Sequence, residues 1–498
     1  MPEPAQRLTQ TEPMIEFLLN GEPLRITDED PNCTLLDFLR DRLHHTGSKE
    51  GCASGDCGAC TAALGELDGE TIHYKSINTC ITPLGNVHGK HLVTVEELKQ
   101  GQQLHPAQQA MVDCHGSQCG FCTPGFVMSL FVLGRDEISA PDRHRIEESL
   151  GGNLCRCTGY RPIIEAAVQM FDPALQAERD PFTEREAEWV KVLQSMNRDQ
   201  DVELSGGGHH YVAPATSARL AQLLQHYPAA RLVAGGTDLA LELTQQLCSI
   251  DTLIYTGRVR EMIGVSETDT HLIIGAAASY NQFGPALTAL YPECRELLER
   301  LGSRQIRNQG TLGGNIGNAS PIGDMPPLLL ALGASLRLRG AERVRELPLE
   351  QFFLGYKRTA LQAGEFIEAI LVPRPAPGDS LRVYKISKRF EDDISSSCGA
   401  FLLSLDQQIV TRVRVAFGGM DAIPRRALEC EQALLGKPLD DVAIAAAMAA
   451  LARDFTPISD FRASSDYRLQ VSQNLLKRLQ LELNSPSATL LSRVNQHA

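Results

Sequence analysis

Residues 51–60 read GCASGDCGAC. This stretch places Cys52, Cys57 and Cys60 in a C-x4-C-x2-C pattern, and Cys80 follows as a plausible fourth member of the set. The residues between the cysteines are small or glycine, so the backbone can wrap closely around a compact group and turn its N–H groups toward the sulfurs. The stretch therefore predicts a loop whose thiolates bind a metal centre.

A second set of four cysteines follows. Cys119 and Cys122 lie in QCGFCTPG, and Cys155 and Cys157 lie in CRCTGYRP. One residue separates the last pair, which is short for a zinc site, where two to four intervening residues are usual. The neighbouring segments HPAQQAMVDCHG, PGFVMSLFVLG and RHRIEESLGGNL have helical periodicity. We therefore expect this set at helix ends, where free N–H groups and the positive end of the dipole favour anionic groups.

The spacing of the first set is typical of plant-type ferredoxins, in which four thiolates hold a [2Fe–2S] cluster. The N-terminal residues MPEPAQRLTQTEPM lack the charged and then apolar pattern of a signal peptide. We therefore expect a cytoplasmic protein, in whose reducing compartment clustered thiols bind metals rather than form disulfides. The two sets predict two redox centres in series. Structural zinc is the alternative for each set. The spacing argues against zinc more strongly in the first set than in the second.

Composition limits the class of protein. At 498 residues the chain has room for three or four domains of roughly 100–200 residues each. Its net charge of −14 argues against binding to nucleic acid or to an anionic membrane surface. No apolar run approaches the roughly 20 residues that span a bilayer. We expect a soluble multidomain protein without a nucleic-acid or membrane partner.

Periodicity predicts the order of the elements. Residues 14–22 alternate and then turn at Asn20-Gly21, which indicates a hairpin, and PNCTLLDFLRDRL has the pattern of an amphipathic helix. With the strand-like segments CTAALGEL and HLVTVEEL, this order predicts a small mixed β-sheet that clasps a helix. The charged segment around Trp189 predicts a partly helical linker that runs over a surface. Strands and helices alternate from residue 206, and strands followed by helices form a distinct unit after about residue 385.

Two glycine-rich segments, Leu232–Asp238 (LVAGGTD) and Gly310–Asn315 (GTLGGN), are candidates for phosphate binding. Neither matches the Rossmann G-x-G-x-x-G pattern. Glycines nevertheless let the backbone approach a ligand, and consecutive amides can bind an anion. An ordinary tight turn is the alternative for each segment. Two such segments downstream of two cluster motifs favour a flavin, which accepts single electrons and exchanges pairs with a soluble acceptor.

The combination closely resembles the iron–sulfur and FAD portion of the xanthine dehydrogenases, in the molybdenum hydroxylase family. The segments GCASGDCGAC, QCGFCTPGF and NLCRCTGYRPI resemble that family's cluster motifs in the same order. The segments LVAGGTDL, TLGGNIGNASPIGDMPP, FFLGYKRT, KRFEDDIS and FGGM resemble its flavin-domain motifs. The resemblance extends from about residue 14 to about residue 480.

The resemblance implies a multidomain α+β fold. Its expected parts are a β-grasp [2Fe–2S] ferredoxin-like domain at 14–98, a helical-bundle [2Fe–2S] domain at 99–172, a linker at 173–205, an FAD-binding α+β domain of the vanillyl-alcohol-oxidase-like type at 206–384, and a small C-terminal α/β flavoprotein domain at 385–490.

The resemblance also implies the site residues. The expected ligands are Cys52, Cys57, Cys60 and Cys80 for the first cluster, and Cys119, Cys122, Cys155 and Cys157 for the second. The expected FAD contacts are Leu232, Val233, Ala234, Gly235, Gly236, Thr237 and Asp238, then Thr311, Leu312, Gly313, Gly314 and Asn315, and finally Asp324, Ile367 and Lys385. The acidic residues Glu391–Asp393 resemble a loop that influences access of the electron acceptor, and a solvated charge cluster is the alternative.

The implied function is that of the electron-transfer and flavin subunit of a xanthine dehydrogenase. Electrons from purine hydroxylation at a molybdopterin centre on a partner chain would pass through two [2Fe–2S] clusters to FAD and on to NAD⁺. The expected partner is a molybdopterin-binding large subunit, in a heterotetramer with two copies of each subunit. We expect no catalytic acid, base or nucleophile in this chain. The alternatives are the equivalent subunit of a molybdenum hydroxylase acting on aldehydes or another N-heterocycle, and a zinc-stabilised scaffold or redox sensor.

Overall fold

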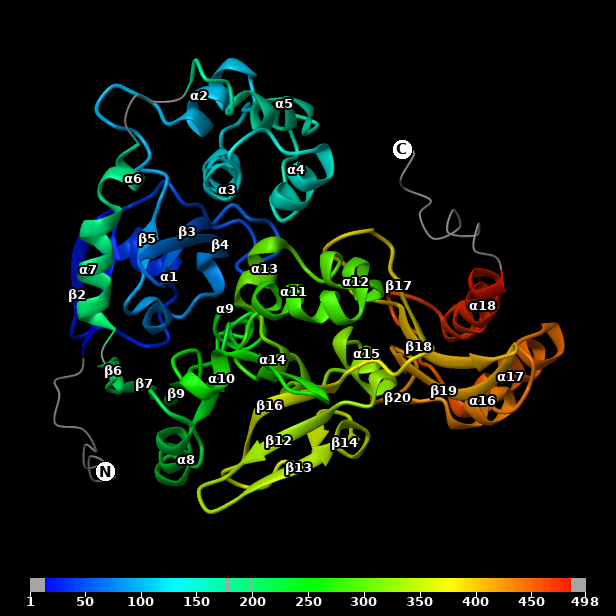
Figure 1. The fold of residues 1–498 in the computed structure, drawn as a ribbon. Coiled ribbons are helices and arrows are strands. Elements are labelled where there is room, and N and C mark those ends of the chain that lie inside the picture. Colours follow the sequence, from blue (N-terminus) through cyan, green and yellow to red (C-terminus); the bar gives the residue numbers. More distant parts are fainter. Residues whose placement is uncertain (1–13, 176–179, 198, 485–498) are drawn as a thin grey trace. The chain divides into compact units, whose positions relative to one another are not determined.

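A computed structural model describes residues 14–175, 180–197 and 199–484 (Figure 1). The chain forms two compact units, and each is described by itself. The first unit comprises the residues up to Met262 together with Gly302–Gly310, and the second comprises Ile263–Leu301 and the residues from Thr311 onward. The multidomain α+β fold class expected from the sequence is confirmed.

The first unit begins with a five-stranded mixed sheet in the order β2-β1-β5-β3-β4. Its strands are β1 (Ile15–Leu19), β2 (Glu22–Ile26), β3 (Thr61–Asp68), β4 (Thr71–Asn78) and β5 (His91–Val93). Asn20 and Gly21 both have positive φ, as a two-residue hairpin turn with the twist of its strands requires, so the predicted hairpin is confirmed. β5 runs parallel to β1 and antiparallel to β3.

The predicted amphipathic helix packs against this sheet. It begins at Thr34, whose Oγ1 accepts a hydrogen bond from the Asp37 backbone N–H. It continues as α1 (Leu35–Asp37) and then as a π-helical turn, η1 (Phe38–Arg42). Short 3₁₀ turns at Thr79–Ile81 and Leu84–Val87 lead from β4 toward β5. A mixed sheet that clasps a helix is the β-grasp arrangement expected from the sequence.

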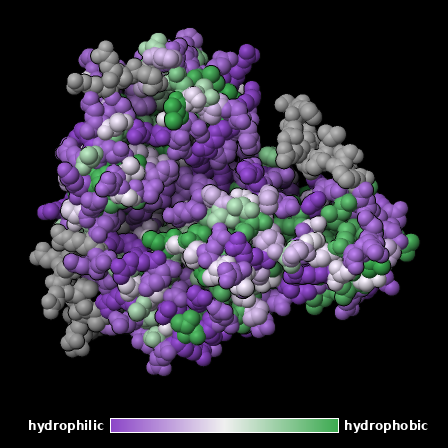
Figure 2. Space-filling view, viewed as in Figure 1, coloured by the Kyte–Doolittle hydropathy of each residue, from purple (hydrophilic) through white to green (hydrophobic). Residues whose placement is uncertain are grey.

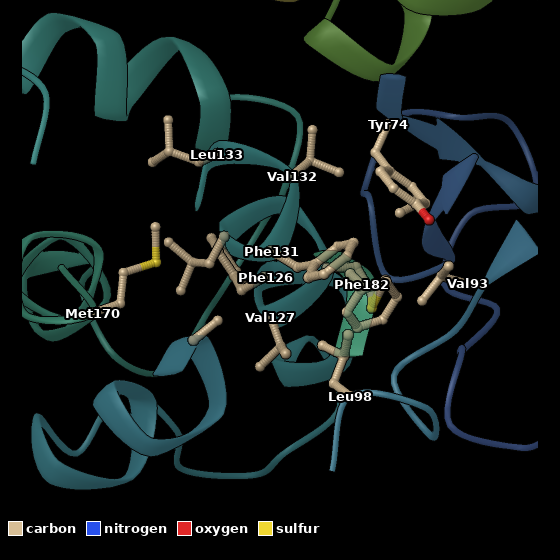
Figure 3. Close-up of a cluster of buried hydrophobic side chains, with 14 of the residues drawn as sticks. Tyr74, Val93, Leu98, Phe126, Val127, Phe131, Val132, Leu133, Met170 and Phe182 are labelled. Atoms are coloured by element: carbon tan, nitrogen blue, oxygen red, sulfur yellow. The ribbon is translucent and has the colours of Figure 1, made fainter. Parts of the chain in front are cut away.

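Four helices follow, and the first three lie in the three segments for which the periodicity predicted helices. They are α2 (Pro106–Asp113), α3 (Thr123–Asp136), α4 (Arg143–Leu150) and α5 (Arg161–Gln169). α3 is buried along most of its length and carries Phe126 and Phe131 into the core. Figure 3 shows Phe131 beside Phe182 and Tyr74, with the ring centroids of Phe131 and Phe182 4.8 Å apart. This core joins the helices to the first sheet.

The segment expected to be a surface linker contributes to the same core. It forms α6 (Pro181–Glu184) and α7 (Glu186–Met196), in which Phe182 and Trp189 are buried. The Trp189 indole N–H donates to the Gly21 carbonyl oxygen at 3.2 Å, and its ring packs 4.5 Å from that of His91. The partly helical character is confirmed. The sequence did not predict that α7 has a buried face, because the charged residues of its outer face dominate the pattern.

A second sheet completes the first unit, in the order β6-β7-β9-β8. Its strands are β6 (Val202–Gly206), β7 (His209–Ala213), β8 (Arg231–Val233) and β9 (Thr252–Tyr255). The associated helices are α8 (Ser217–His226), α9 (Ala240–Thr244) and α10 (Arg260–Ile263), and the returning segment adds α13 (Arg304–Gln309). β7, β9 and β8 run parallel to one another, as expected of alternating strands and helices.

The second unit contains a five-stranded antiparallel sheet in the order β10-β11-β16-β12-β13. Its strands are β10 (Val265–Glu267), β11 (His271–Gly275), β12 (Ser335–Arg339), β13 (Val344–Pro348) and β16 (Phe366–Pro373), with a small hairpin of β14 (Phe353–Gly355) and β15 (Arg358–Thr359). The helices are α11 (Tyr280–Leu290), α12 (Arg295–Glu299), α14 (Leu312–Gly317) and α15 (Met325–Leu332), with 3₁₀ turns at Pro292–Cys294 and Leu349–Gln351.

The C-terminal part of this unit is an antiparallel sheet followed by helices. The strands are β17 (Asp379–Ile386), β18 (Ser397–Asp406), β19 (Ile409–Gly418) and β20 (Arg425–Arg426), and the helices are α16 (Leu428–Leu434), α17 (Asp441–Asp454) and α18 (Ser465–Asn484). The predicted order of strands and then helices is confirmed. β17 pairs with β18 from Asp379 onward, so the sheet begins before the boundary expected at residue 385.

The face of the molecule seen in Figure 2 is largely hydrophilic, with smaller hydrophobic areas among the charged and polar side chains. Within the described residues, no helix combines the length and the apolar character that crossing a bilayer requires.

The buried His88 and His91 and the half-buried His105 make the stability of the first unit depend on pH. Burial lowers the pKa of His91 to about 3 and the pKa values of His88 and His105 to about 4. His91 Nε2 accepts the Gly21 N–H at 3.0 Å, and Nδ1 lies 2.9 Å from the Tyr74 hydroxyl. The structure therefore holds a neutral His91, because protonation of Nε2 would break the bond from Gly21.

We predict that the unit loses stability as the pH falls below about 6.5, because the unfolded histidines bind protons that the folded ones exclude. Each histidine should contribute about 1.4 kcal/mol per pH unit until its folded pKa is reached. Urea unfolding followed by circular dichroism should show a smaller pH slope for His91→Gln. The exposed control His73→Gln should keep the wild-type slope, and an unchanged slope in His91→Gln would contradict the assignment.

Candidate functional site

The structure brings the four thiols of the first set together. Cys60 Sγ lies 3.3 Å from Cys80 Sγ, and the thiols of Cys57 and Cys80 lie near enough to Cys52 to lower the pKa of its thiol. The backbone N–H groups of Ser54 and Asp56 point at Cys52 Sγ, at 3.4 and 3.3 Å. Such N–H contacts are expected of a loop that stabilises anionic sulfur. Cys60 and Cys80 are buried, and Cys52 and Cys57 are half-buried.

The second set also converges, in two pairs. Cys155 lies near enough to Cys122 to raise the pKa of the Cys122 thiol, and Cys119 near enough to Cys157 to raise that of the Cys157 thiol. Cys122 directly precedes α3, which confirms the expected place at a helix end for that residue. Cys155 and Cys157 lie in the loop before α5. Cys119 and Cys157 are exposed. The first set therefore lies inside the unit, and the second opens to its surface.

Hydrogen bonds and burial shift the pKa values of thiols in both sets. Hydrogen bonds from Cys57 and Cys80 lower the pKa of the Cys52 thiol. Burial opposes ionisation of Cys155, but hydrogen bonds from Thr158 outweigh it and lower its pKa. Burial raises the pKa of Cys122 to about 12. Thiolate is the form that binds metal, and each set contains a thiol already biased toward it.

All fourteen cysteines are free thiols. Among the described residues, no three His, Cys, Asp or Glu side chains are grouped as they would be around one metal ion. The contacts between thiols link all four cysteines of the first set and form two pairs in the second. Four thiolates are the number that holds one [2Fe–2S] cluster.

The first glycine-rich segment begins in β8 and continues as a turn before α9. Leu232 and Val233 belong to β8, and Gly236 has a positive φ. A Cβ on Gly235 would lie 1.9 Å from the Gln309 carbonyl oxygen, so this glycine is required for close contact with the C-terminal end of α13. Asn86 Nδ2 donates to the Ala234 carbonyl at 3.2 Å and fixes the turn from the other side. Thr237 is half-buried and Asp238 is exposed.

The second glycine-rich segment is helical rather than a loop. Thr311 caps α14 by accepting the Gly314 N–H at 3.1 Å, and Leu312 is buried. A Cβ on Gly313 would lie 2.4 Å from the Ala276 Cβ, and the Gly313 N–H donates to the Ala276 carbonyl at 2.9 Å. This close approach explains why helix-disfavouring glycines occur here. Thr311–Asn315 lies in the second unit and Leu232–Asp238 in the first.

Three of the other expected flavin contacts lie in the second unit as a group around α14 and α15. Asp324 precedes α15 and forms a buried ion pair with Lys385 of β17, with 2.5 Å between Oδ2 and Nζ. Ser395 Oγ donates to the other Asp324 oxygen at 2.5 Å. Ile367 of β16 is buried, and its Cδ1 is 3.8 Å from where a Cβ on Gly317 of α14 would lie.

One polar atom in this group is buried without a partner. Within the described residues, Asn315 Oδ1 has no hydrogen-bond partner. Its neighbour Gly323 approaches it closely, with 3.4 Å from the position of an added Cβ to Oδ1. A buried carbonyl oxygen is costly to leave unpaired, so this atom indicates a donor that the polypeptide does not itself supply.

The acidic residues Glu391–Asp393 form a tight loop. Asp393 accepts the backbone N–H groups of Arg389 at 2.8 Å and Ile394 at 3.0 Å. Burial raises the pKa of Asp393, but these hydrogen bonds and the Arg389 guanidinium outweigh it and lower the pKa overall. Asp393 therefore stabilises the turn.

The sequence reasoning missed the side chains that fix the first cysteine loop from outside. Asn78 Nδ2 donates to the Gly55 carbonyl at 2.7 Å, and its Oδ1 lies 3.8 Å from Cys60 Sγ. Gln309 of α13 accepts the Asn78 N–H at 3.0 Å and donates to Thr82 at 2.7 Å. The available signal was the run of polar amides in SRQIRNQ, directly before the second glycine-rich segment.

Family comparisons place four domains along the chain. A 2Fe-2S iron-sulfur cluster binding domain matches residues 17–85, and a [2Fe-2S] binding domain matches 94–168. The FAD binding domain in molybdopterin dehydrogenase matches 203–375, and the CO dehydrogenase flavoprotein C-terminal domain matches 382–483. The chain thus carries domains for two [2Fe–2S] clusters and for FAD.

Among solved structures, carbon monoxide dehydrogenase from Hydrogenophaga pseudoflava is similar with a TM-score of 0.52 and 30% sequence identity, over 54% of this chain and 94% of that chain. The chain belongs to the molybdenum hydroxylase family. Quinoline 2-oxidoreductase from Pseudomonas putida 86 is similar to this molybdenum hydroxylase chain with a TM-score of 0.50 and 27% identity, over the same shares of the two chains.

Curated relatives of this molybdenum hydroxylase chain include xanthine dehydrogenase from Emericella nidulans, which is 34% identical over 89% of this chain and 36% of the relative. Xanthine dehydrogenase 1 from Arabidopsis thaliana is 30% identical over 84% of this chain and 36% of the relative. The chain thus spans about a third of the length of these relatives.

We predict that Gly313→Ala destabilises the second unit by about 1–3 kcal/mol, because the new methyl group overpacks the contact with Ala276. The variant should also retain less FAD after gel filtration, measured by visible absorbance. Gly264→Ala is the matched control, because a Cβ there meets no atom within 4 Å. Equal stability and equal flavin content in both variants would contradict the role given to this glycine.

Proposed function

We propose that this chain is the electron-transfer and flavin subunit of a xanthine dehydrogenase. It passes electrons from purine hydroxylation, at a molybdopterin centre on a partner chain, through two [2Fe–2S] clusters to FAD and on to NAD⁺. The observation that carries the proposal is the convergence of two sets of thiols in a chain whose domains are those for two clusters and a flavin. Several xanthine dehydrogenases are similar to it over most of its length.

The residues present fit these cofactors. Thiols in pairs, with backbone N–H groups aimed at sulfur, suit a [2Fe–2S] cluster at each set. The proposed ligands are Cys52, Cys57, Cys60 and Cys80, and Cys119, Cys122, Cys155 and Cys157. When bound, the clusters supply one-electron transfer, and FAD links this to exchange of electron pairs with a soluble acceptor.

The flavin contacts of the second unit fit a polar ligand. The unpaired Asn315 Oδ1 can accept a hydrogen bond from it. The buried Asp324–Lys385 pair supplies a charge of each sign at a fixed position. We propose these residues, with Ile367 and Leu232–Asp238, as the FAD contacts.

Exposure supports a direction for electron flow. Cys119 and Cys157 lie at the surface, where a partner can approach, whereas Cys60 and Cys80 are buried. Electrons would therefore enter at the second set and pass inward to the first. The chain's part is to hold both sets in place and to exclude water from the inner one. We propose a molybdopterin-binding large subunit as the partner, in a cytoplasmic heterotetramer with two copies of each subunit.

A second candidate is the same subunit in an enzyme that oxidises another substrate. The similarity to carbon monoxide dehydrogenase and quinoline 2-oxidoreductase favours it. Co-purification from the native host, followed by mass identification of the partner and assays with xanthine, an aldehyde and quinoline, separates the two. Reduction of NAD⁺ by xanthine supports our proposal. A complex active only with another substrate would overturn the assignment of xanthine, and one active only with another acceptor would overturn the assignment of NAD⁺.

We predict that the double variant Cys119→Ser, Cys122→Ser loses about half of the iron and acid-labile sulfide but keeps its FAD, because the ligands of only one cluster are removed. Reduction of its flavin by purine should stop, while reduction by dithionite persists. Cys248→Ser changes an exposed cysteine outside both sets and should behave as wild type. Unimpaired flavin reduction by purine in the double variant would exclude electron transfer in series, and colourless wild-type protein containing zinc would identify a scaffold.

A further inference from the structure

A buried polar network joins the two cysteine loops. It consists of the side chains of Thr61, Ser129, Asn153 and Gln305, each at most 2% exposed. They come from β3, α3, the segment after α4, and α13. Burying a polar group costs free energy unless its hydrogen bonds are made. A network of four such side chains in a core therefore indicates that these residues must be held in fixed positions, which apolar packing alone would not achieve.

Asn153 is the centre of the network. Its Nδ2 donates to the Gly58 carbonyl at 3.0 Å and to Thr61 Oγ1 at 3.2 Å. Its Oδ1 accepts from Ser129 Oγ at 2.6 Å and from Gln305 Nε2 at 3.1 Å. Gly58 lies between two ligands of the first set, and Asn153 lies just before Cys155 of the second. One side chain thus touches the first loop from the start of the second.

The residue after Asn153 connects the loops through the backbone. The Leu154 N–H donates to the Cys57 carbonyl at 2.9 Å. Leu154 is bonded directly to Cys155, and Cys57 is a proposed ligand of the first cluster. A single hydrogen bond therefore links the backbone next to a ligand of the second set with the backbone of a ligand of the first. Asn153, the residue before Leu154, is itself bonded to the first loop through the Gly58 carbonyl.

Gln305 holds Asn153 from a segment far away in the sequence. Its Nε2 also lies 3.2 Å from Thr61 Oγ1 and 3.4 Å from Ser129 Oγ. α13 is itself anchored to the helical part, because Arg304 donates to Ser149 Oγ at 2.9 Å and Arg307 forms an ion pair with Glu148. Asn308 anchors it to the sheet by donating to the Ser76 carbonyl at 2.8 Å.

Gln305 is not arranged for stability alone. The side chain is fully buried, yet among the described residues its Oε1 has no hydrogen-bond partner. A methionine of similar volume would fill the space without burying an unpaired oxygen. Because the unpaired oxygen lowers the stability of the fold, its presence indicates that the Gln305 amide has a function.

We propose that Gln305 is a positioning residue for electron transfer between the two cysteine loops. Its amide fixes Asn153, and so keeps the Leu154 N–H to Cys57 carbonyl bond short. One electron would pass from the cluster held by the second set of thiolates to the cluster held by the first, so the donor cluster is oxidised by one electron and the acceptor cluster reduced by one, with no proton transferred and no covalent bond broken. The inference rests on the proposed function, because it assumes a [2Fe–2S] cluster at each set.

The test compares Gln305→Met with Gln225→Met, a control at an exposed position of α8. Ser129→Ala is a second, milder variant that removes one bond to Asn153 and keeps a good helix former in α3. Hydrogen exchange by mass spectrometry should show the Leu154 amide exchanging about fivefold faster in Gln305→Met, the effect of weakening one buried hydrogen bond. The control should match wild type.

Electron paramagnetic resonance of the dithionite-reduced full chain gives the second readout. The magnetic interaction between the two reduced centres should weaken or broaden in Gln305→Met, and less so in Ser129→Ala, while the iron content stays unchanged. Reduction of FAD through the second cluster should slow several-fold in the same order. A purely structural role predicts a lower unfolding temperature with an unchanged magnetic interaction, and that result would overturn the inference.

The outcomes separate this inference from the proposed function. If wild-type protein shows no paramagnetic signal after reduction, both fail. If wild type shows two interacting centres and both variants with full iron content keep the wild-type interaction and Leu154 exchange, only the role of Gln305 is refuted. If Gln305→Met does not fold, Ser129→Ala decides by the same two measurements.

Discussion

The structure of the first unit depends on the hydrogen bonds that hold its first cysteine loop, which has no regular secondary structure. Residues 51–60 belong to no helix or strand, so their carbonyl groups have no ladder partners. Side chains and backbone from elsewhere supply the donors, with Asn78 bonded to Gly55, Asn153 to Gly58 and Leu154 to Cys57. Buried carbonyls require such partners because water cannot reach them.

This requirement explains the architecture around the loop. α3 and the segment after α4 must lie against it to supply Asn153, and α13 must return from later in the chain to hold Asn153 and Asn78 through Gln305 and Gln309. Apolar packing around α3 gives these elements a rigid base. The same contacts bring the second set of cysteines close to the first. The need of the first loop's carbonyl groups for hydrogen-bond donors therefore also determines how far apart the two sets lie.

The second unit shows a different balance of forces. Its glycine-rich segment is a helix because Thr311 caps it and because Gly313 fits closely against Ala276, which outweighs the low helix propensity of glycine. The buried Asp324–Lys385 pair costs desolvation that its own attraction only partly offsets. An ion pair of this kind is weak evidence for stability and better evidence for a site whose charges must stay in position.

The sequence by itself determined the local elements and the two sets of thiols. Hairpin turns and helices are predicted from residues that are near one another in the sequence. The spacing of the cysteines likewise indicates the metal centre that they can bind. It could not show that Trp189 is buried, since the charged face of its helix dominates the pattern. Only the tertiary structure decided which amides hold the loops, because Gln305 and Asn153 meet across 152 positions. Hydrogen bonds between residues so far apart leave no periodic signal.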